Sequence, residues 1–222
     1  VAIGSGAGTA ITTGDLMTAV GFRALFTEDT GERSTAVGAY ALTAQNSAVE
    51  NYNTAVGYAA GTAVTTGVQN TLIGALSGDA ITTGSNNTSV GMNSLSANTT
   101  ASYNSAFGKS ALLSNTTGAN NSAVGFGALA NNTTGTANSA MGGTTLTTNT
   151  TGSYNSGFGR DSLGLNTTGS NNVAVGESAL YANTTASNNT AVGKSALVAN
   201  TTGANNVALG ATSLQLNTTG AN

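Results

Sequence analysis

Residues 189–205 read Asn189-Thr190-Ala191-Val192-Gly193-Lys194-Ser195-Ala196-Leu197-Val198-Ala199-Asn200-Thr201-Thr202-Gly203-Ala204-Asn205, and variants of this 17-residue unit fill the chain. Each unit has a glycine that closes a small–apolar–Gly triplet, here called the closing glycine. The closing glycines are Gly4, Gly21, Gly38, Gly57, Gly74, Gly91, Gly108, Gly125, Gly142, Gly159, Gly176, Gly193 and Gly210. They are 17 residues apart, except that Gly38 and Gly57 are 19 apart. This period predicts a tandem-repeat protein of about thirteen coils.

The length and chemistry of the unit predict a β-coil. Helical-pair repeats need about 33 to 47 residues and leucine-rich repeats about 20 to 29. The Thr-Ala-Val segment favours a strand, in which Thr and Val point to one side and Ala to the other. The closing glycine predicts a corner with positive φ or a close backbone approach. Asn-Thr-Thr-Gly predicts a second turn with a left-handed glycine, replaced by alanine at Ala101 and Ala186.

We therefore expect an all-β parallel β-solenoid, or β-roll, whose coils each have two extended arms and two turns. Stacked coils lie about 4.8 Å apart, and their asparagines should form ladders. Residues 1–222 are expected to form a single repeat domain. Within it, residues 1–90 form less regular coils, with a two-residue insertion near 45–51, and residues 91–222 form regular coils.

A reciprocal exchange indicates one shared core. Ten coils carry Leu four residues after the closing glycine and a polar residue three places later. The other three coils carry glycine at the Leu position and an aliphatic residue at the later one: Gly8 with Ile11, Gly61 with Val64, and Gly78 with Ile81. One aliphatic plug per coil is what a narrow, close-packed interior requires. The two positions are predicted to fill one space.

Composition excludes most chemistry. The chain has no His, Cys, Pro or Trp, so it offers no imidazole base, thiol nucleophile, disulfide or Cys/His metal site. Its 6% charged residues form no basic stripe, and no apolar run is long enough to span a membrane. Asp161 and Glu177 lack the surroundings of a glycosidase carboxylate pair. We expect no enzyme activity, no cofactor, no nucleic-acid partner and no membrane insertion.

The thin core favours self-association. Each coil is expected to bury one Val, one Leu and two Ala, which is little apolar surface for the ordering of 17 residues. A second buried face against another chain would help. The small residue at the middle of the first arm suits such a contact between chains, as at Ala19, Ala36, Ala55, Ala106, Ala123, Ala174, Ala191 and Ala208.

Two resemblances follow from these motifs. Val1-Ala2-Ile3-Gly4, Val173-Ala174-Val175-Gly176 and Val207-Ala208-Leu209-Gly210 resemble the core motif of trimeric autotransporter adhesin heads, which are left-handed parallel β-rolls. The longer Asn-Thr-Ala-Val-Gly…Asn-Thr-Thr-Gly unit resembles repeats of bacterial-virus (phage) tail-fibre proteins. The resemblance implies a homotrimeric shaft or head used for attachment. Adhesin heads usually repeat at about 14 residues rather than 17, so handedness and interface are not carried over.

Three sets of residues are candidate sites. Eight asparagines begin Asn-Thr-Thr, an N-glycosylation sequon, although a turn role set by coil geometry is preferred. They are Asn98, Asn115, Asn132, Asn149, Asn166, Asn183, Asn200 and Asn217. Tyr52, Tyr103 and Tyr154, with Lys109 and Arg160, recur at 51-residue intervals, which indicates either duplication of a three-coil block or sugar-stacking rings beside a cation. The charged set Arg23, Glu28, Asp29, Glu32 and Arg33 is expected to be a solvated edge or a domain junction.

The leading interpretation is a structural fibre or adhesin segment without enzymatic activity. It would be an extended shaft or head for host-cell or surface attachment, extracellular, on a virion tail fibre or a cell surface. Its expected partners are copies of itself and a cell-surface receptor or glycan. One alternative is an ice-binding solenoid with stacked Thr ranks, of which only one points outward because adjacent residues of an arm face opposite sides. Another is a glycosylated extracellular surface filament.

Overall fold

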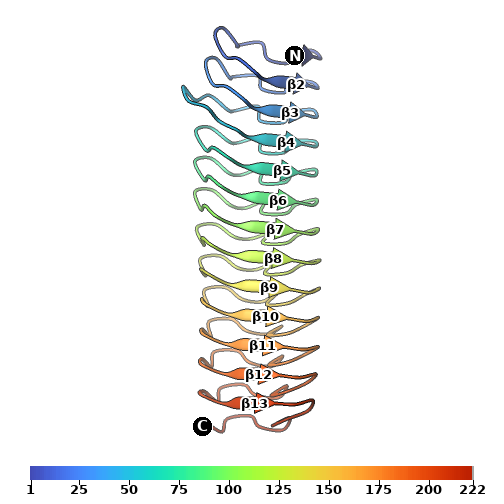
Figure 1. Ribbon diagram of the computed structural model, residues 1–222, viewed down its shortest axis with the longest axis vertical. Coiled ribbons are helices and arrows are strands. Elements are labelled where there is room, and N and C mark those ends of the chain that lie inside the picture. Colours follow the sequence, from blue (N-terminus) through green and yellow to red (C-terminus); the bar gives the residue numbers. More distant parts are fainter. Residues whose placement is uncertain (222) are drawn as a thin grey trace. The chain divides into compact units, whose positions relative to one another are not determined.

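The chain folds as a parallel β-solenoid with one short strand in each coil (Figure 1). The computed structural model describes residues 1–221, so residue 222 of the predicted repeat domain lies outside the described residues. That part of the chain holds thirteen strands and no helix, which confirms the predicted fold class. The chain divides into two compact units, Val1–Ser110 and a second that begins at Ala111.

The strands of each unit pair in parallel with their neighbours in chain order. The first unit contains β1 (Ala2–Ile3), β2 (Thr18–Val20), β3 (Thr35–Val37), β4 (Thr54–Val56), β5 (Thr71–Ile73), β6 (Thr88–Val90) and β7 (Ser105–Phe107). The second contains β8 (Ser122–Val124), β9 (Ser139–Met141), β10 (Ser156–Phe158), β11 (Val173–Val175), β12 (Thr190–Val192) and β13 (Val207–Leu209). Equivalent residues face each other, as Ala191 does with Ala208. Thr35 still pairs with Thr54, so the insertion is absorbed outside the strands.

Both reasons predicted for the closing glycine are present. All thirteen have φ between 117° and 140°, a region that residues with a Cβ rarely adopt. A Cβ on Gly176 would also stand 2.6 Å from the carbonyl carbon of Gly193 in the next coil. The invariance of this glycine therefore follows from the corner and from the close stacking.

The glycine of the Asn-Thr-Thr-Gly turn was predicted to be left-handed, and this is wrong. Gly135 and its equivalents do not have positive φ. A Cβ on Gly135 would instead stand 2.5 Å from Oδ1 of Asn132. The left-handed residue comes two places later, where Asn205 has φ 62°. Asparagine tolerates that conformation better than most residues, which explains its frequency there.

Only one of the two predicted arms is a strand. In the other arm left-handed residues alternate with ordinary ones, as at Ser195 (φ 55°) and Leu197 (φ 51°). This alternation is incompatible with a pleated strand. The arm nevertheless bonds to the next coil, since the Leu197 amide donates to the Ser213 carbonyl at 2.9 Å.

The interior holds alanine, leucine and asparagine, and the strand valine points outward. The mid-strand alanines named above are at most 2% exposed, and Leu112, Leu146 and Leu197 are fully buried. Val192 is only half-buried and Val175 is 37% exposed. Thr and Val do share one side, as predicted. However, the expectations that each coil buries its Val and that the alanine row lies between chains are wrong, because that row faces the protomer's own core.

The reciprocal core exchange is confirmed and extended by one residue. A Cβ on Gly78 would stand 2.8 Å from Cδ1 of Ile81, so the two positions do share a space. It would also stand 2.8 Å from Cδ2 of Leu72. Leu72 takes the mid-strand place that alanine holds in most coils, and it fills volume vacated at both Gly61 and Gly78.

Candidate functional site

The described residues contain few converging reactive groups. Within residues 1–221, no three His, Cys, Asp or Glu side chains come together as a potential metal site. In the same range, no helix could cross a membrane. The remaining features are the outer face of the strands, the inner asparagines, and the side chains of the less regular coils.

The outer face of the strands carries two rows, here called the hydroxyl row and the apolar row. In the first unit the hydroxyl row is Thr18, Thr35, Thr54, Thr71, Thr88 and Ser105, and the apolar row is Val20, Val37, Val56, Ile73, Val90 and Phe107. In the second unit the positions hold Ser122, Ser139, Ser156, Val173, Thr190 and Val207, beside Val124, Met141, Phe158, Val175, Val192 and Leu209. Met141 is 52% exposed and Phe158 39%. A shallow groove of about 120 Å³ runs between the rows at Ser122, Met141 and Phe158.

The Asn-Thr-Thr asparagines form a ladder inside the coils, here called the turn ladder. Each Nδ2 of Asn132, Asn149, Asn166, Asn183, Asn200 and Asn217 donates to Oδ1 of the asparagine one coil earlier, at 2.8–3.1 Å. The same nitrogen donates to a carbonyl three residues ahead, as Asn132 does to Gly135 at 2.9 Å. Asn115 lies in this ladder, and in the first unit Asn98 donates to the Ala101 carbonyl at 3.0 Å. All are fully buried except Asn217, which is half-buried.

Burial of these nitrogens supports the preferred turn interpretation of the sequons. A glycan would have to leave through the core from an atom that already donates two hydrogen bonds. The coil has no room for it, since even a Cβ on Gly152 would stand 2.5 Å from Oδ1 of Asn149.

A second asparagine ladder, which precedes each strand, is here called the strand ladder. Asn138, Asn155, Asn172, Asn189 and Asn206 each donate a backbone amide to Oδ1 of the equivalent asparagine one coil earlier, at 2.9–3.1 Å. Their Nδ2 atoms donate to carbonyls of the following turn, as Asn138 does to Gly152 at 2.9 Å. The asparagines therefore satisfy polar backbone inside a narrow coil, which confirms the predicted ladders.

The Thr-Thr pairs leave one outward hydroxyl per coil, as the sequence predicts. In coils away from the ends the first Thr is half-buried, and its hydroxyl donates to a carbonyl one coil on, as Thr133 does to Thr150 at 3.0 Å. The second Thr, such as Thr134, is exposed.

Glu28 is fully buried, so its predicted place on a solvated edge is wrong. Its carboxylate accepts hydrogen bonds from the Gly31 amide at 2.8 Å, Gln45 Nε2 at 2.8 Å, Asn51 Nδ2 at 3.3 Å and the Ser47 amide at 3.4 Å. All four partners are donors, and no cation of residues 1–221 pairs with it. The side-chain oxygen of Asn51 is buried without a hydrogen-bond partner.

Around the insertion, Tyr52 joins two charged residues. Arg33 donates to the Tyr52 hydroxyl at 2.7 Å, and that hydroxyl donates to Glu50 at 2.6 Å. Arg33 also pairs with Glu50 and lies 5.5 Å from the Tyr52 ring. The hydrogen bond with Tyr52, with the charge of Glu50, raises the pKa of Arg33 above its ordinary value. The Arg33 charge is thus neutralised locally.

The other recurring residues do not repeat this arrangement. Tyr103 and Tyr154 are 62% and 63% exposed, and no cation of residues 1–221 lies over either ring. Lys109 is exposed. Arg160 pairs with Glu177 and, at 3.6 Å, with Asp161. The sequence interval therefore does not mark a repeated aromatic–cation site.

Glu177 lies between two cations of neighbouring coils. Besides Arg160, Lys194 pairs with it at 3.1 Å. Hydrogen bonds from Arg160 and Lys194 lower the pKa of Glu177, and the bond to Glu177 raises the pKa of Arg160. Asp161 and Glu177 therefore both form ion pairs with Arg160.

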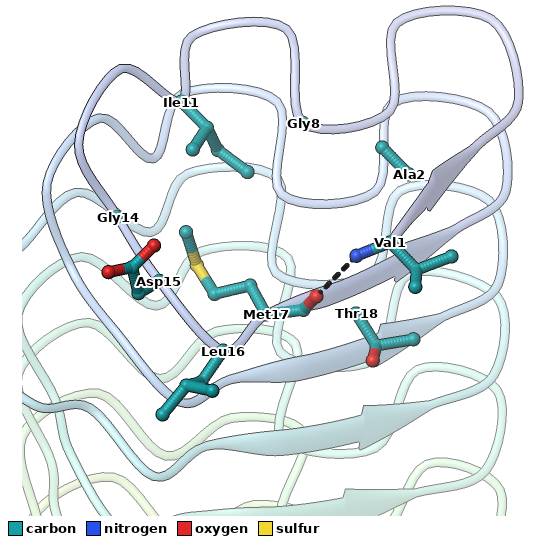
Figure 2. Close-up of a pocket in the computed structure, with 9 residues that line it drawn as sticks. All are labelled: Val1, Ala2, Gly8, Ile11, Gly14, Asp15, Leu16, Met17 and Thr18. Atoms are coloured by element: carbon teal, nitrogen blue, oxygen red, sulfur yellow. Dashed lines mark hydrogen bonds between the residues drawn. The ribbon is translucent and has the colours of Figure 1, made fainter.

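A hollow of about 630 Å³ lies at the open end of the core at the first coil (Figure 2). Ile11 and Met17 line it, and the Val1 amino group donates to the Met17 carbonyl at 2.7 Å. Asp15 is its only charged side chain among the lining residues. Thr18 and Val1 also line it, so the hollow is partly polar and partly apolar.

Comparison of the chain with protein-family models, with curated proteins and with solved structures finds no match.

Proposed function

We propose that this chain is a structural segment of an extracellular fibre or adhesin and has no enzymatic activity. It would serve as a shaft or head for attachment, on a virion tail fibre or a cell surface. The observation that carries the proposal is the division of each coil into a hydrogen-bonded interior and an outer face with one apolar residue per coil. The Leu, Asn and mid-strand Ala side chains are buried within the coil. Val124, Met141 and Phe158, which occupy equivalent positions in successive coils, remain exposed.

We further propose that the segment is a homotrimer joined through the apolar and hydroxyl rows. A row that repeats once per coil is complementary to the same row on another copy, because both have the same rise. The resemblance to trimeric adhesin heads and phage tail-fibre repeats supports this assembly. Light scattering on the purified chain tests it. We expect a trimer, and we expect it to disassemble when the outward Val192 is replaced by a charged residue. A stable monomer at micromolar concentration would contradict the proposal.

Ice binding is a second candidate, favoured by one observation. The second Thr of each Thr-Thr pair is exposed in successive coils, for example at Thr134, Thr151 and Thr168, and gives a regular rank of hydroxyl and methyl groups. Thermal hysteresis of the purified chain, lost on Thr151→Lys, would establish this role. Ordinary colligative freezing would eliminate it.

A further inference from the structure

Four aromatic residues gather on three successive coils of the first unit. The Phe22 and Tyr40 rings meet edge to face with centroids 5.3 Å apart, and the Tyr40 and Tyr58 rings do so at 6.0 Å. Phe22 is 43% exposed and Tyr58 is 57% exposed. Phe26 lies beside Phe22, linked to it by a shared cation. These rings form a continuous aromatic surface open to solvent.

The register of the coils explains this cluster. Phe22 and Tyr58 both directly follow a closing glycine, whereas the coil between them has Ala39 there and Tyr40 one place later. The Tyr40 amide donates to the Phe22 carbonyl at 2.8 Å, which holds the two residues side by side. The small side chain of Ala39 leaves room for the Tyr40 ring between the other two.

Arg23 brings a positive charge to the same surface. Its guanidinium lies 5.4 Å from the Phe22 ring centroid and 4.9 Å from that of Phe26. Arg23 is exposed, and no carboxylate of residues 1–221 lies within ion-pair distance of it. Arg33 and Arg160, in contrast, are both paired with acidic side chains. The rings hold the Arg23 guanidinium in place and leave its donors available to an external anion.

From this geometry we propose that Phe22, Arg23, Tyr40 and Tyr58 form a binding site for an acidic saccharide. The C–H faces of a sugar ring pack on aromatic surface, and the Tyr hydroxyls can hydrogen-bond to sugar hydroxyls. A guanidinium binds a carboxylate through two parallel hydrogen bonds. The chain has a net charge of −3, so general attraction of polyanions is absent and the patch itself must provide recognition. This deepens the attachment role proposed above and rests on it.

Titration with oligogalacturonate, which carries one carboxylate per sugar, tests the site. The chain has no Trp, so its intrinsic emission comes from six tyrosines, two of them in the patch. Two probes serve as comparisons: the methyl ester of oligogalacturonate, which keeps the sugar ring without charge, and polyglutamate, which keeps the carboxylates without sugar. We expect saturable binding of oligogalacturonate, and binding of both comparison probes weaker by about tenfold or more.

Matched variants locate the site. Tyr58→Ala and Arg23→Gln should each weaken binding about tenfold, since each removes one recognition element. Phe126→Ala is the aromatic control, because Phe126 holds the same coil position and is 61% exposed, with no cation over its ring. Lys109→Gln is the charge control. Both controls should bind within about twofold of the native chain. Thermal melts establish that every variant is folded.

The proposal would be overturned by equal binding of the methyl ester, by equal binding of polyglutamate, or by an equal loss of binding in the control variants. Light scattering on the same samples separates this site from the assembly. A trimer that binds no oligogalacturonate contradicts the saccharide site alone, whereas a monomer that binds it contradicts only the trimer.

Discussion

Leu72 occupies the space beside Gly61: its Cδ1 lies 2.6 Å from the place that a Cβ on Gly61 would take. Leu72 is fully buried in β5, and its own coil has Gly78 where most coils have Leu. Aliphatic side chains thus fill the same core space in these coils, whether they come from the strand, as Leu72 does, or from the arm that follows the closing glycine.

This relationship predicts non-additive effects in a double-mutant cycle. Leu72→Ala should destabilise by about 2–5 kcal/mol through a cavity. Gly61→Leu alone should destabilise by about 1–3 kcal/mol, because the new side chain meets Leu72. The double variant should be more stable than the sum of the two effects by at least about 1 kcal/mol. Urea unfolding measures all three, and simple additivity would refute the shared volume.

Because of the turn ladder, loss of a buried asparagine side chain should reduce stability far more than loss of an exposed one. Asn149→Ala removes the hydrogen bonds to Asn132 and Gly152 and the one accepted from Asn166. It leaves buried polar groups unpaired, at a cost of about 1–3 kcal/mol for each group. Asn131→Ala, at an exposed position, should change stability by less than about 0.5 kcal/mol. Similar losses in the two variants, measured by thermal melting, would argue against a structural ladder.

The two sides of β12 should respond differently to charge. Ala191→Glu places a carboxylate in a fully buried position and should unfold the coil locally. Val192→Glu faces outward and should leave the circular dichroism spectrum unchanged while it disrupts the proposed trimer. Lys109→Glu, exposed, outside the strands and in no ion pair within residues 1–221, is the control. If Val192→Glu has no effect on molar mass in light scattering, the apolar row is not the contact between chains.

Replacement of Glu28 by its neutral isostere glutamine should destabilise the folded chain. Because all four partners of its carboxylate are donors, Glu28→Gln would turn an NH₂ group toward at least one of them. A loss of about 1–3 kcal/mol is expected in chemical unfolding. Glu32→Gln, half-buried in the same coil, is the comparison and should be nearly neutral. Equal stability of Glu28→Gln and the native chain would mean that the buried group does not need its charge.

Glu177 predicts a small acid-dependent loss of stability. Its pKa is lower in the folded chain than in the unfolded chain, because Arg160 and Lys194 donate to it. The contribution is therefore present above the ordinary Glu pKa and is lost as the pH falls through the lowered value. Melting temperatures from neutral pH to about pH 3 should fall less steeply for Glu177→Gln. At about 1 M salt the difference should vanish, since the ion pairs are exposed. A difference that persists in salt would contradict this origin.

The sequence alone determined the repeat, the parallel coil and the closing-glycine corner. A 17-residue period with a glycine at one fixed place admits few folds, and alternation along Thr-Ala-Val already separates two sides of the strand. The exchange of Leu with Ile or Val in the sequence also identifies one shared core volume, although the pattern does not show that Leu72 fills part of it.

Only the tertiary structure decided which side faces inward. The alternation of side chains along Thr-Ala-Val separates two sides of the strand but does not say which side is buried. Hydrophobicity favours the side that carries Val. The alternating left-handed residues of the second arm, such as Ser195 and Leu197, accompany a narrow interior in which the mid-strand place holds alanine in most coils. Leu72 fits at that place because Gly61 and Gly78 leave space beside it. The asparagines turn inward because the narrow channel contains backbone carbonyls that need donors. The burial of Glu28 and the Phe22–Tyr40–Tyr58 contacts likewise depend on which side chains the stacking brings together, and the repeat pattern does not encode that.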